Sequence, residues 1–380
     1  MQKYSKISLI YFVSIVLITI IYATIAIYLH DPLQIWHKPF FRKQITYSNT
    51  IRESARAMIN NEQFDSIIIG NSHTENTSCK VAEKLFGGKF INLSISGSTL
   101  YEKNLILSYL LKRKKVKKVV YLVDENYATL SLEPLLFDTK QYSFIYNDNP
   151  FDDFKIYLNN KYLFRTLIFS QSKKCIGNIK NMDKPYAWET VSSHIKRFGG
   201  FDNWVKNKKN GQIKGYFNTI LKTPLEYNNQ HLSEEYKKDL HDYLDKYLFT
   251  NIAQAPETDF YIIISPVSDI ELARRIRSYD PIFAKQCELL GYLVIKKNEY
   301  KNFKIYAFND KPNLSSLEDY KDGTHYRPWI NHYILEAIKN NENEINSENV
   351  QEYIDKVYNL AKQFDYEYYY NQIKKVVEEE

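Results

Sequence analysis

Near its N-terminus the chain carries a long apolar run without a single charged residue. The run extends from Ile7 to Leu29 and consists mainly of Ile, Val, Leu, Tyr and Phe. About 23 residues of α-helix span about 34 Å, which matches a bilayer hydrocarbon core of ~30 Å at a slight tilt. A secretory signal peptide usually has an apolar region of only about 7–15 residues and a small-residue cleavage site. This run instead continues into His30-Asp31-Pro32, so we expect an uncleaved transmembrane helix.

The composition of the whole chain is that of a folded protein. Of 380 residues, 44% are hydrophobic and 25% are charged, a mixture typical of globular rather than disordered chains. The net charge of +6 is small for this length, and no nucleic-acid-binding motif accompanies it. Three widely spaced cysteines are too few for a disulfide framework and form no zinc-type CxxC pair. We expect a tethered body that requires no cofactor or metal and binds no nucleic acid.

Short apolar runs alternate with helical segments in this body. Strands are predicted at 66–69, 90–93, 119–124, 260–266, 292–296 and 303–307. Helices are predicted at 78–86, 100–113, 269–289 and 328–339. Strands that are apolar throughout are typical of a buried parallel sheet, and the strand-helix alternation predicts an α/β fold with right-handed connections.

The same pattern predicts the domain organisation. Residues 1–29 form a short head and membrane anchor, 30–62 a connector with a helix near 49–61, 63–340 the α/β domain, and 341–380 a C-terminal helical tail. The positive charges on the two sides of the span are nearly balanced, so the expectation of a cytoplasmic head rests mainly on the family resemblance described below. The α/β rhythm breaks at 127–255, which we interpret as a large insertion of helices and loops ending in a helix near 233–250. In the connector, Trp36 and Phe40 are placed either to rest at the bilayer interface or to pack against the body.

Three residues that suit catalysis follow successive predicted strands. Ligands of open α/β sheets bind beyond the carboxyl ends of the strands. Ser72, in Gly-Asn-Ser-His, can present its hydroxyl at this edge and point its N–H at a developing oxyanion. Gly97 allows close approach of the backbone to a substrate, and the Asn126 side chain is a fixed N–H donor.

A fourth motif, Asp322-Gly-Thr-His325, offers the base that a serine nucleophile needs. A serine hydroxyl is a weak nucleophile until a base takes its proton. Asp322 lies three residues before His325, close enough to orient the imidazole and stabilise its protonated form. His73 follows Ser72 directly; a metal site with His325 and Asp124 is conceivable, but ligand spacing gives no support, and we expect His73 to line the cleft.

Together these motifs resemble the blocks of the SGNH/GDSL hydrolase family. Gly70-Asn71-Ser72 is similar to the family's first block, usually Gly-Asp-Ser, and NLSISGST around Gly97 to its second block. The stretch 124–127 aligns with the third block, usually Gly-x-Asn-Asp, and 322–325 with the fifth block, Asp-x-x-His. The resemblance covers roughly 64–126 and 258–340, and leaves the insertion and tail unexplained.

The resemblance implies a fold and a set of roles. The family fold is a flavodoxin-like three-layer α/β arrangement with a parallel sheet. By position, Ser72 would be the nucleophile, His325 the base and Asp322 its orienting partner, and the N–H groups of Ser72 and Gly97 with the Asn126 amide would form the oxyanion hole. The chain departs from the family pattern in two blocks: Asn71 replaces the usual Asp, and Asn126 lacks the flanking Gly and Asp.

The anchored layout resembles bacterial envelope proteins that acylate or deacylate glycans. It implies a serine esterase or O-acyltransferase that acts through an acyl-enzyme, tethered by a single span in the cytoplasmic membrane with its body outside. An envelope polysaccharide or acyl donor would be its substrate, and a multi-spanning acyl-transfer protein its partner. Two alternatives stay open: a degenerate domain that binds glycan or scaffolds an envelope complex, and a lipid-directed esterase.

Overall fold

The computed structural model describes residues 2–42, 51–124, 138–177 and 182–378, and the chain divides into two compact units. Unit 1 combines Met1–Gln63 with Asp138–Lys180. Unit 2 combines Phe64–Phe137 with Asn181–Glu380. The predicted insertion 127–255 is therefore shared between the two units, and the predicted α/β domain and tail fall in unit 2.

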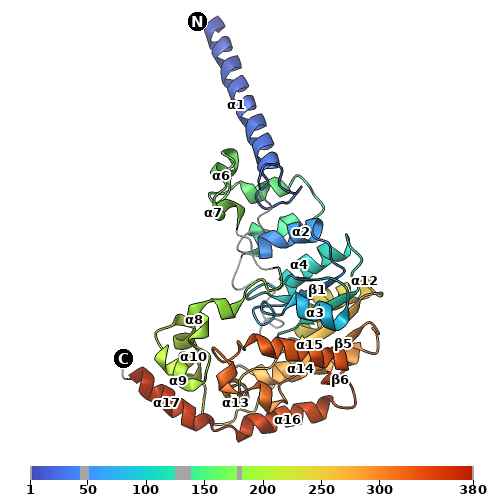
Figure 1. Ribbon diagram of the computed structural model, residues 1–380, viewed down its shortest axis with the longest axis vertical. Coiled ribbons are helices and arrows are strands. Elements are labelled where there is room, and N and C mark those ends of the chain that lie inside the picture. Colours follow the sequence, from blue (N-terminus) through green and yellow to red (C-terminus); the bar gives the residue numbers. More distant parts are fainter. Residues whose placement is uncertain (1, 43–50, 125–137, 178–181, 379–380) are drawn as a thin grey trace. The chain divides into compact units, whose positions relative to one another are not determined.

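Unit 1 starts with α1 (Gln2–His30), an apolar helix at the N-terminal end of the chain (Figure 1). Its stretch Lys6–His30 is long and apolar enough to cross a membrane, and it is the one such helix in the described residues. This agrees with the predicted N-terminal span. The helix ends before Pro32, where the Asp31 carboxylate accepts hydrogen bonds from the N–H groups of Ile35 and Trp36, each at 2.9 Å.

The rest of unit 1 is a set of short helices. They are α2 (Ile51–Asn61), η1 (Thr139–Gln141), η2 (Ser143–Tyr146), η3 (Asp153–Tyr157), α6 (Leu163–Leu167) and α7 (Lys173–Ile176). An ion pair between Arg56 and Asp153, with one nitrogen–oxygen distance of 2.8 Å, joins α2 to η3. Trp36 packs on Phe154 with ring centroids 4.7 Å apart, whereas Phe40 is 58% exposed. Trp36 thus packs against the body, and contact of Phe40 with the bilayer interface stays a prediction.

Unit 2 is built on a mixed six-stranded sheet in the order β2-β1-β3-β4-β5-β6. The strands are β1 (Ser66–Ile69), β2 (Phe90–Asn92), β3 (Lys118–Leu122), β4 (Asp259–Ile264), β5 (Phe303–Ala307) and β6 (Glu344–Ile345). Strands β1 to β5 are parallel, and β6 is antiparallel to β5. The order 2-1-3-4-5 of the parallel strands is that of flavodoxin-like sheets, whose switch point lies between β1 and β3.

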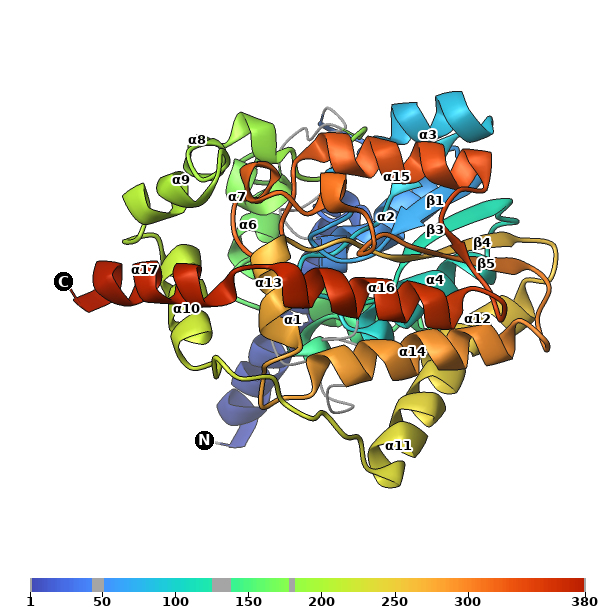
Figure 2. The same ribbon diagram turned by 90° about the horizontal axis from the view of Figure 1, so that it is seen from below.

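Helices cover both faces of this sheet because its strands are apolar on both sides. Ile67, Ile68 and Ile69 of β1 are all fully buried. Helices α3 (Cys79–Phe86) and α15 (Pro328–Asn340) lie on one face, and α4 (Leu100–Leu111), α12 (Thr250–Gln254) and α14 (Ile282–Lys296) on the other (Figure 2). Ser78 caps α3 by accepting the Val81 N–H, and Thr99 caps α4 in a capping box with Glu102.

Two predicted elements are wrong in the same region. The apolar run 292–296, predicted as a strand, is the last part of helix α14. Leu289 and Leu293, four residues apart, are both fully buried on one side of that helix, so packing at helical spacing decides the conformation. The helix predicted at 269–289 is interrupted after α13 (Asp269–Arg275), because Pro281 cannot continue a helix from its preceding turn.

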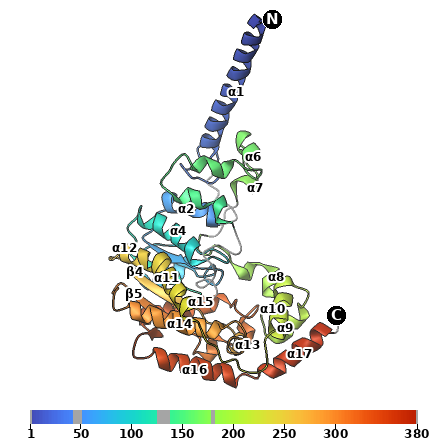
Figure 3. The same ribbon diagram turned by 180° about the vertical axis from the view of Figure 1, so that it is seen from behind.

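The remaining helices of unit 2 surround this core. They are η4 (Trp188–Thr190), α8 (Ser192–Ile195), α9 (Phe201–Lys206), α10 (Gly211–Leu221), α11 (Glu234–Leu244), the π-helical turn η5 (Asp245–Phe249), η6 (Pro312–Leu314), η7 (Leu317–Asp319), α16 (Val350–Gln363) and α17 (Tyr366–Glu378). Figure 3 shows α17 beside α10, against which it packs through the buried Tyr366 and Ile373. The sheet is predicted as parallel throughout, but β6, in the predicted tail, adds an antiparallel edge to it.

Candidate active site

Ser72 lies in a turn that begins at the carboxyl end of β1. Gly70, two residues before Ser72, occupies a position where a side chain does not fit. An added Cβ would overlap the Thr74 hydroxyl and lie 2.8 Å from Leu122 Cβ. The Asn71 side chain fixes the turn: its oxygen accepts the His73 N–H at 2.9 Å. Its amide donates to Asp124 Oδ2, just beyond β3, at 3.0 Å. Asn71 therefore ties the serine turn to the neighbouring strand end.

His325 is held by a short loop, residues 319–327, which we call the histidine loop. A bridge between Tyr320 and Tyr326 closes the loop. The Gly323 carbonyl accepts hydrogen bonds from the backbone N–H and the hydroxyl of Ser268, the residue that precedes α13, at 3.1 and 2.8 Å. These contacts fix the loop to the sheet edge beyond β4, which is the edge where Ser72 lies.

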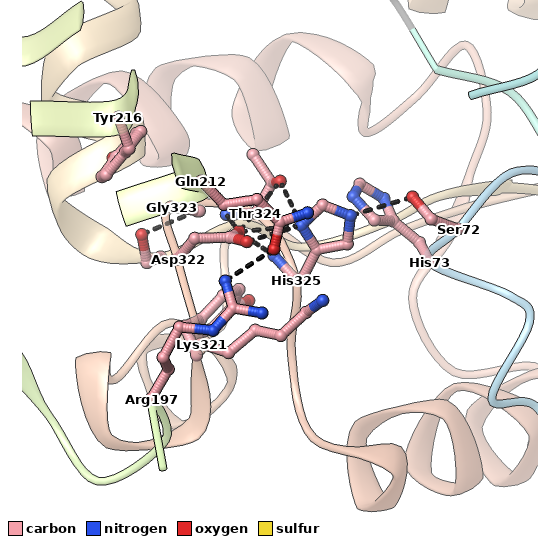
Figure 4. Close-up of polar contacts among 12 residues, drawn as sticks. Ser72, His73, Arg197, Gln212, Tyr216, Lys321, Asp322, Gly323, Thr324 and His325 are labelled. Carbon is pink, nitrogen blue, oxygen red and sulfur yellow. Dashed lines mark hydrogen bonds and ion pairs between the residues drawn. The ribbon is translucent and has the colours of Figure 1, made fainter. Parts of the chain in front are cut away.

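Ser72, His325 and Asp322 meet across 253 residues of sequence (Figure 4). Ser72 Oγ is 2.9 Å from His325 Nε2. His325 Nδ1 is 2.8 and 2.9 Å from the two carboxylate oxygens of Asp322. A ring that donates from Nδ1 to the carboxylate leaves Nε2 as the acceptor of the Ser72 hydroxyl. The arrangement is that of a serine, a base and an orienting carboxylate.

The electrostatics of the loop keep Asp322 ionised. Burial by itself would raise the pKa of Asp322, but the imidazole of His325, its hydrogen bonds and the nearby Lys321 hold that pKa well below its usual range. The carboxylate also accepts the backbone N–H groups of Thr324 and His325, at 3.1 and 3.0 Å. The His325 side chain is 21% exposed, against 9% for that of Asp322, so the imidazole is more accessible than the carboxylate.

Two aromatic rings enclose the His325 imidazole. His73 and Trp188 each approach it edge-on with centroids 5.2 Å away. The ring of His73 also contacts Ser265, just beyond β4, with Nδ1 and Oγ 2.9 Å apart. Burial lowers the pKa of His73 to about 3, and the neighbouring His325 acts in the same direction. His73 is therefore a neutral wall of the site, as the predicted lining role requires.

A group of basic side chains that the sequence analysis missed lies beside Asp322. The ammonium of Lys321 is 3.1 Å from His194 Nδ1 and lies over the Trp188 ring, 4.1 Å from its centroid. Burial lowers the pKa of Lys321 to about 8, opposed by Asp322 and assisted by Arg197. Lys321 could have been found from the sequence, because it directly precedes the Asp-x-x-His motif. Trp188, His194 and Arg197 could not, because their segment shows no hydrophobic periodicity.

Gly97 lies in a second loop at the same edge of the sheet. The Gly70 carbonyl accepts the Ile95 N–H at 2.9 Å and the Ser98 hydroxyl at 3.1 Å, which ties this loop to the start of the serine turn. Gly97 has a φ of 61°, a left-handed conformation that favours glycine. Within the described ranges, neither the Gly97 N–H nor the Ser72 N–H donates to a protein acceptor. Both are free to bind an oxyanion.

The third predicted oxyanion donor, Asn126, lies outside the described residues. Asp124, at the end of the same strand connection, is described and is bound by the Asn71 amide. In the described part of the chain, no three His, Cys, Asp or Glu side chains are grouped so that they could hold a metal ion.

Comparison with known proteins adds no relative to this description. No family model matches the chain, and no curated protein matches it. The structure itself therefore defines the class of the chain. It is an α/β protein with a mostly parallel sheet, an N-terminal helix able to span a membrane, and a serine-histidine-aspartate arrangement at the carboxyl edge of the sheet.

Proposed function

We propose that this chain is a membrane-anchored serine esterase or O-acyltransferase of the SGNH type. The observation that carries the proposal is the contact of 2.9 Å between Ser72 Oγ and His325 Nε2, with Asp322 on the opposite ring nitrogen. Two distant segments meet with the correct atoms facing one another. A flavodoxin-like strand order and the position of all three residues beyond strand ends support the same class.

The chemistry follows from the roles of these groups. His325 takes the proton of the Ser72 hydroxyl while Oγ forms a bond to the carbonyl carbon of an ester. Asp322 stabilises the resulting imidazolium, and the N–H groups of Ser72 and Gly97, with the Asn126 amide, bind the oxyanion. The tetrahedral intermediate expels the alcohol, which receives the proton from His325. Water or a second hydroxyl then attacks the acyl-serine, again with His325 as base, and releases an acid or a new ester.

The substrate and location rest on the resemblance and on α1. An envelope polysaccharide, or the donor of its acyl groups, is the proposed substrate. We place the body outside the cytoplasmic membrane of a bacterium, with a multi-spanning protein as the source of acyl groups. The ring of Trp188 on one side of His325 removes water from part of the site, a condition under which transfer to a hydroxyl competes with hydrolysis.

The direct test is covalent labelling of the full-length protein in membranes with a fluorophosphonate. The reagent forms a bond between Ser72 Oγ and phosphorus, and fluoride leaves. We expect labelling of the wild type and its loss in Ser72→Ala and His325→Ala. Ser347→Ala and His231→Ala, which change exposed residues of the same types, should label normally.

The outcome also separates the enzyme from the non-catalytic alternative. A folded wild type that neither labels nor hydrolyses p-nitrophenyl acetate would support a glycan-binding or scaffolding domain. Labelling that persists in Ser72→Ala would remove this serine from the mechanism. In serine hydrolases, loss of the nucleophile or base lowers turnover by about 10⁴–10⁶, so the assay has a wide range.

A further inference from the structure

Unit 1 holds a short segment against the side of the membrane helix. Residues 161–170, which include α6 and which we call the α6 segment, lie beside the second half of α1 (Figure 1). The Tyr22 hydroxyl donates to the Leu167 carbonyl at 2.8 Å. Near the helix end, His30 Nε2 is 3.1 Å from the Ser170 carbonyl oxygen. The two contacts fix the height of the α6 segment along α1.

The position of the α6 segment along α1 is hard to reconcile with a bilayer that contains α1 alone. Tyr22 lies well inside the stretch Lys6–His30 that can span a membrane. If the α6 segment stayed in water, only the helix from Ile7 to Ile21 would remain for lipid, about 15 residues or about 22 Å. The hydrocarbon core is ~30 Å thick, so the span would be short by about 8 Å. The conflict disappears if the α6 segment enters the bilayer together with α1.

The side chains of the α6 segment suit such a position. Phe164, in α6, and Ile168, directly after its end, are 68% and 75% exposed. Lys161, at the start of the segment, is also exposed, and the Arg165 guanidinium folds back onto the Lys161 carbonyl. An apolar face bordered by basic residues is typical of helices that lie in the interface between lipid tails and headgroup phosphates.

The backbone of the segment is also compatible with a medium poor in water. The N–H groups of Thr166, Phe169 and Ser170 donate to carbonyls within the segment, at 2.8, 3.1 and 2.8 Å. Internal hydrogen bonding is the condition for placing backbone in or near hydrocarbon. The apolar surface continues into the connector, where Phe41 is 71% exposed and its ring lies 6.4 Å from that of Phe169.

We infer that the α6 segment is a second membrane contact, a non-spanning element that inserts its apolar face into the leaflet on the side of the body. Lipid is the occupant because the surface is continuous with α1, which is long and apolar enough to span a bilayer. Phe164 and Ile168 lie among the acyl chains, and Lys161 and Arg165 at the level of the phosphates. A single helix can rotate and tilt freely, whereas two contacts fix how unit 1 stands on the membrane. The inference does not depend on the proposed catalysis.

Spin labelling of the full-length protein in phosphatidylcholine–phosphatidylglycerol nanodiscs tests this inference. The label is attached at Ile168→Cys in a Cys287→Ser background, since the other two cysteines are buried. Reference labels at Ile18→Cys on α1 and at Tyr279→Cys in unit 2 report lipid and water, because both positions are exposed and residue 18 lies in the part of α1 that faces lipid whether or not the α6 segment inserts. Collision rates with oxygen and with a water-soluble nickel chelate then give the depth of each label.

We expect the label at residue 168 to be shielded like the label at residue 18, with several-fold less access to the nickel chelate than the label at residue 279. The substituted residue is exposed, so the substitution leaves the fold intact. A label at 168 that is as accessible to the chelate as the one at 279 would overturn the inference. In that lipid-only system, the same result would leave a protein partner as the occupant of this surface.

Discussion

Replacing Gly323 by alanine should distort the histidine loop. An added Cβ would overlap ring atoms of Tyr216, which covers this part of the loop. The ring cannot swing away easily, because its buried hydroxyl bonds to Glu271 Oε2 at 3.1 Å and two bonds from Arg274 hold that carboxylate. The loop cannot move freely either, because the carbonyl of residue 323 is bound by Ser268. The extra methyl group therefore forces a shift in one of two fixed structures.

Overpacking of this kind costs about 1–3 kcal/mol, which for a unit of this size lowers the melting temperature by roughly 2–12 °C. A shift of about 1 Å in a reacting group can cost about 10²-fold in rate, so fluorophosphonate labelling should slow by up to that factor. Differential scanning calorimetry and a labelling time course on the same sample measure both effects.

Gly215→Ala is the matched control. Gly215 lies in α10, next to Tyr216, and no atom lies within 4 Å of an added Cβ. There the substitution should stabilise by about 0.5–1 kcal/mol, since alanine is the better helix former. In a Tyr216→Ala background, the cost of Gly323→Ala should fall by more than about 1 kcal/mol. The reasoning fails if Gly323→Ala costs nothing, or costs the same with and without the tyrosine ring.

Three further substitutions test the groups around the serine. Asp322→Asn should lower esterase turnover by about 10⁴-fold, because the imidazole loses its orienting carboxylate; p-nitrophenyl acetate hydrolysis measures this, and an unchanged rate would exclude the role. Asn71→Asp should place a carboxylate against Asp124 in a buried contact and lower the free energy of unfolding by about 1–3 kcal/mol. Addition of Asp124→Asn should restore much of that loss, which urea unfolding measures. A double variant without recovery would contradict the pairing. Burial lowers the pKa of Lys321 to about 8 from 10.5. Between pH 8 and 10.5 the lysine is therefore protonated in the unfolded chain but largely neutral in the folded one. The free energy of unfolding of the wild type should rise over this range relative to that of Lys321→Met, by about 2–3 kcal/mol. A difference between the two proteins that does not change with pH would contradict the lowered pKa.

The strands were predictable where burial on both faces leaves a clear signature. The strands Ser66–Ile69 and Phe303–Ala307 have the bounds that were predicted for them. The run 292–296 was predicted wrongly, because its four apolar residues, 292–295, fit a strand and a helix equally well. Only the packing of Leu289 and Leu293 on a longer helix distinguishes the two, and that depends on what lies opposite.

The meeting of Ser72 with His325 was predictable because parallel strands bring their carboxyl ends to one edge. The surroundings of the imidazole were not. The position of Trp188 beside His325 is fixed by a hydrogen bond of 2.7 Å from the Trp188 backbone N–H to Asn76 Oδ1. That contact joins two loops with no pattern of their own, so it exists only once the tertiary structure has formed.

The distance of 253 residues between the serine and its base has a consequence during synthesis. At about 5–20 residues per second, the ribosome delivers His325 about 13–50 s after Ser72 has left the peptidyl-transferase centre. Until then the hydroxyl has no base and is chemically ordinary. Under the proposed mechanism, a nascent chain therefore stays unreactive until residue 325 has been added and has folded against the serine turn.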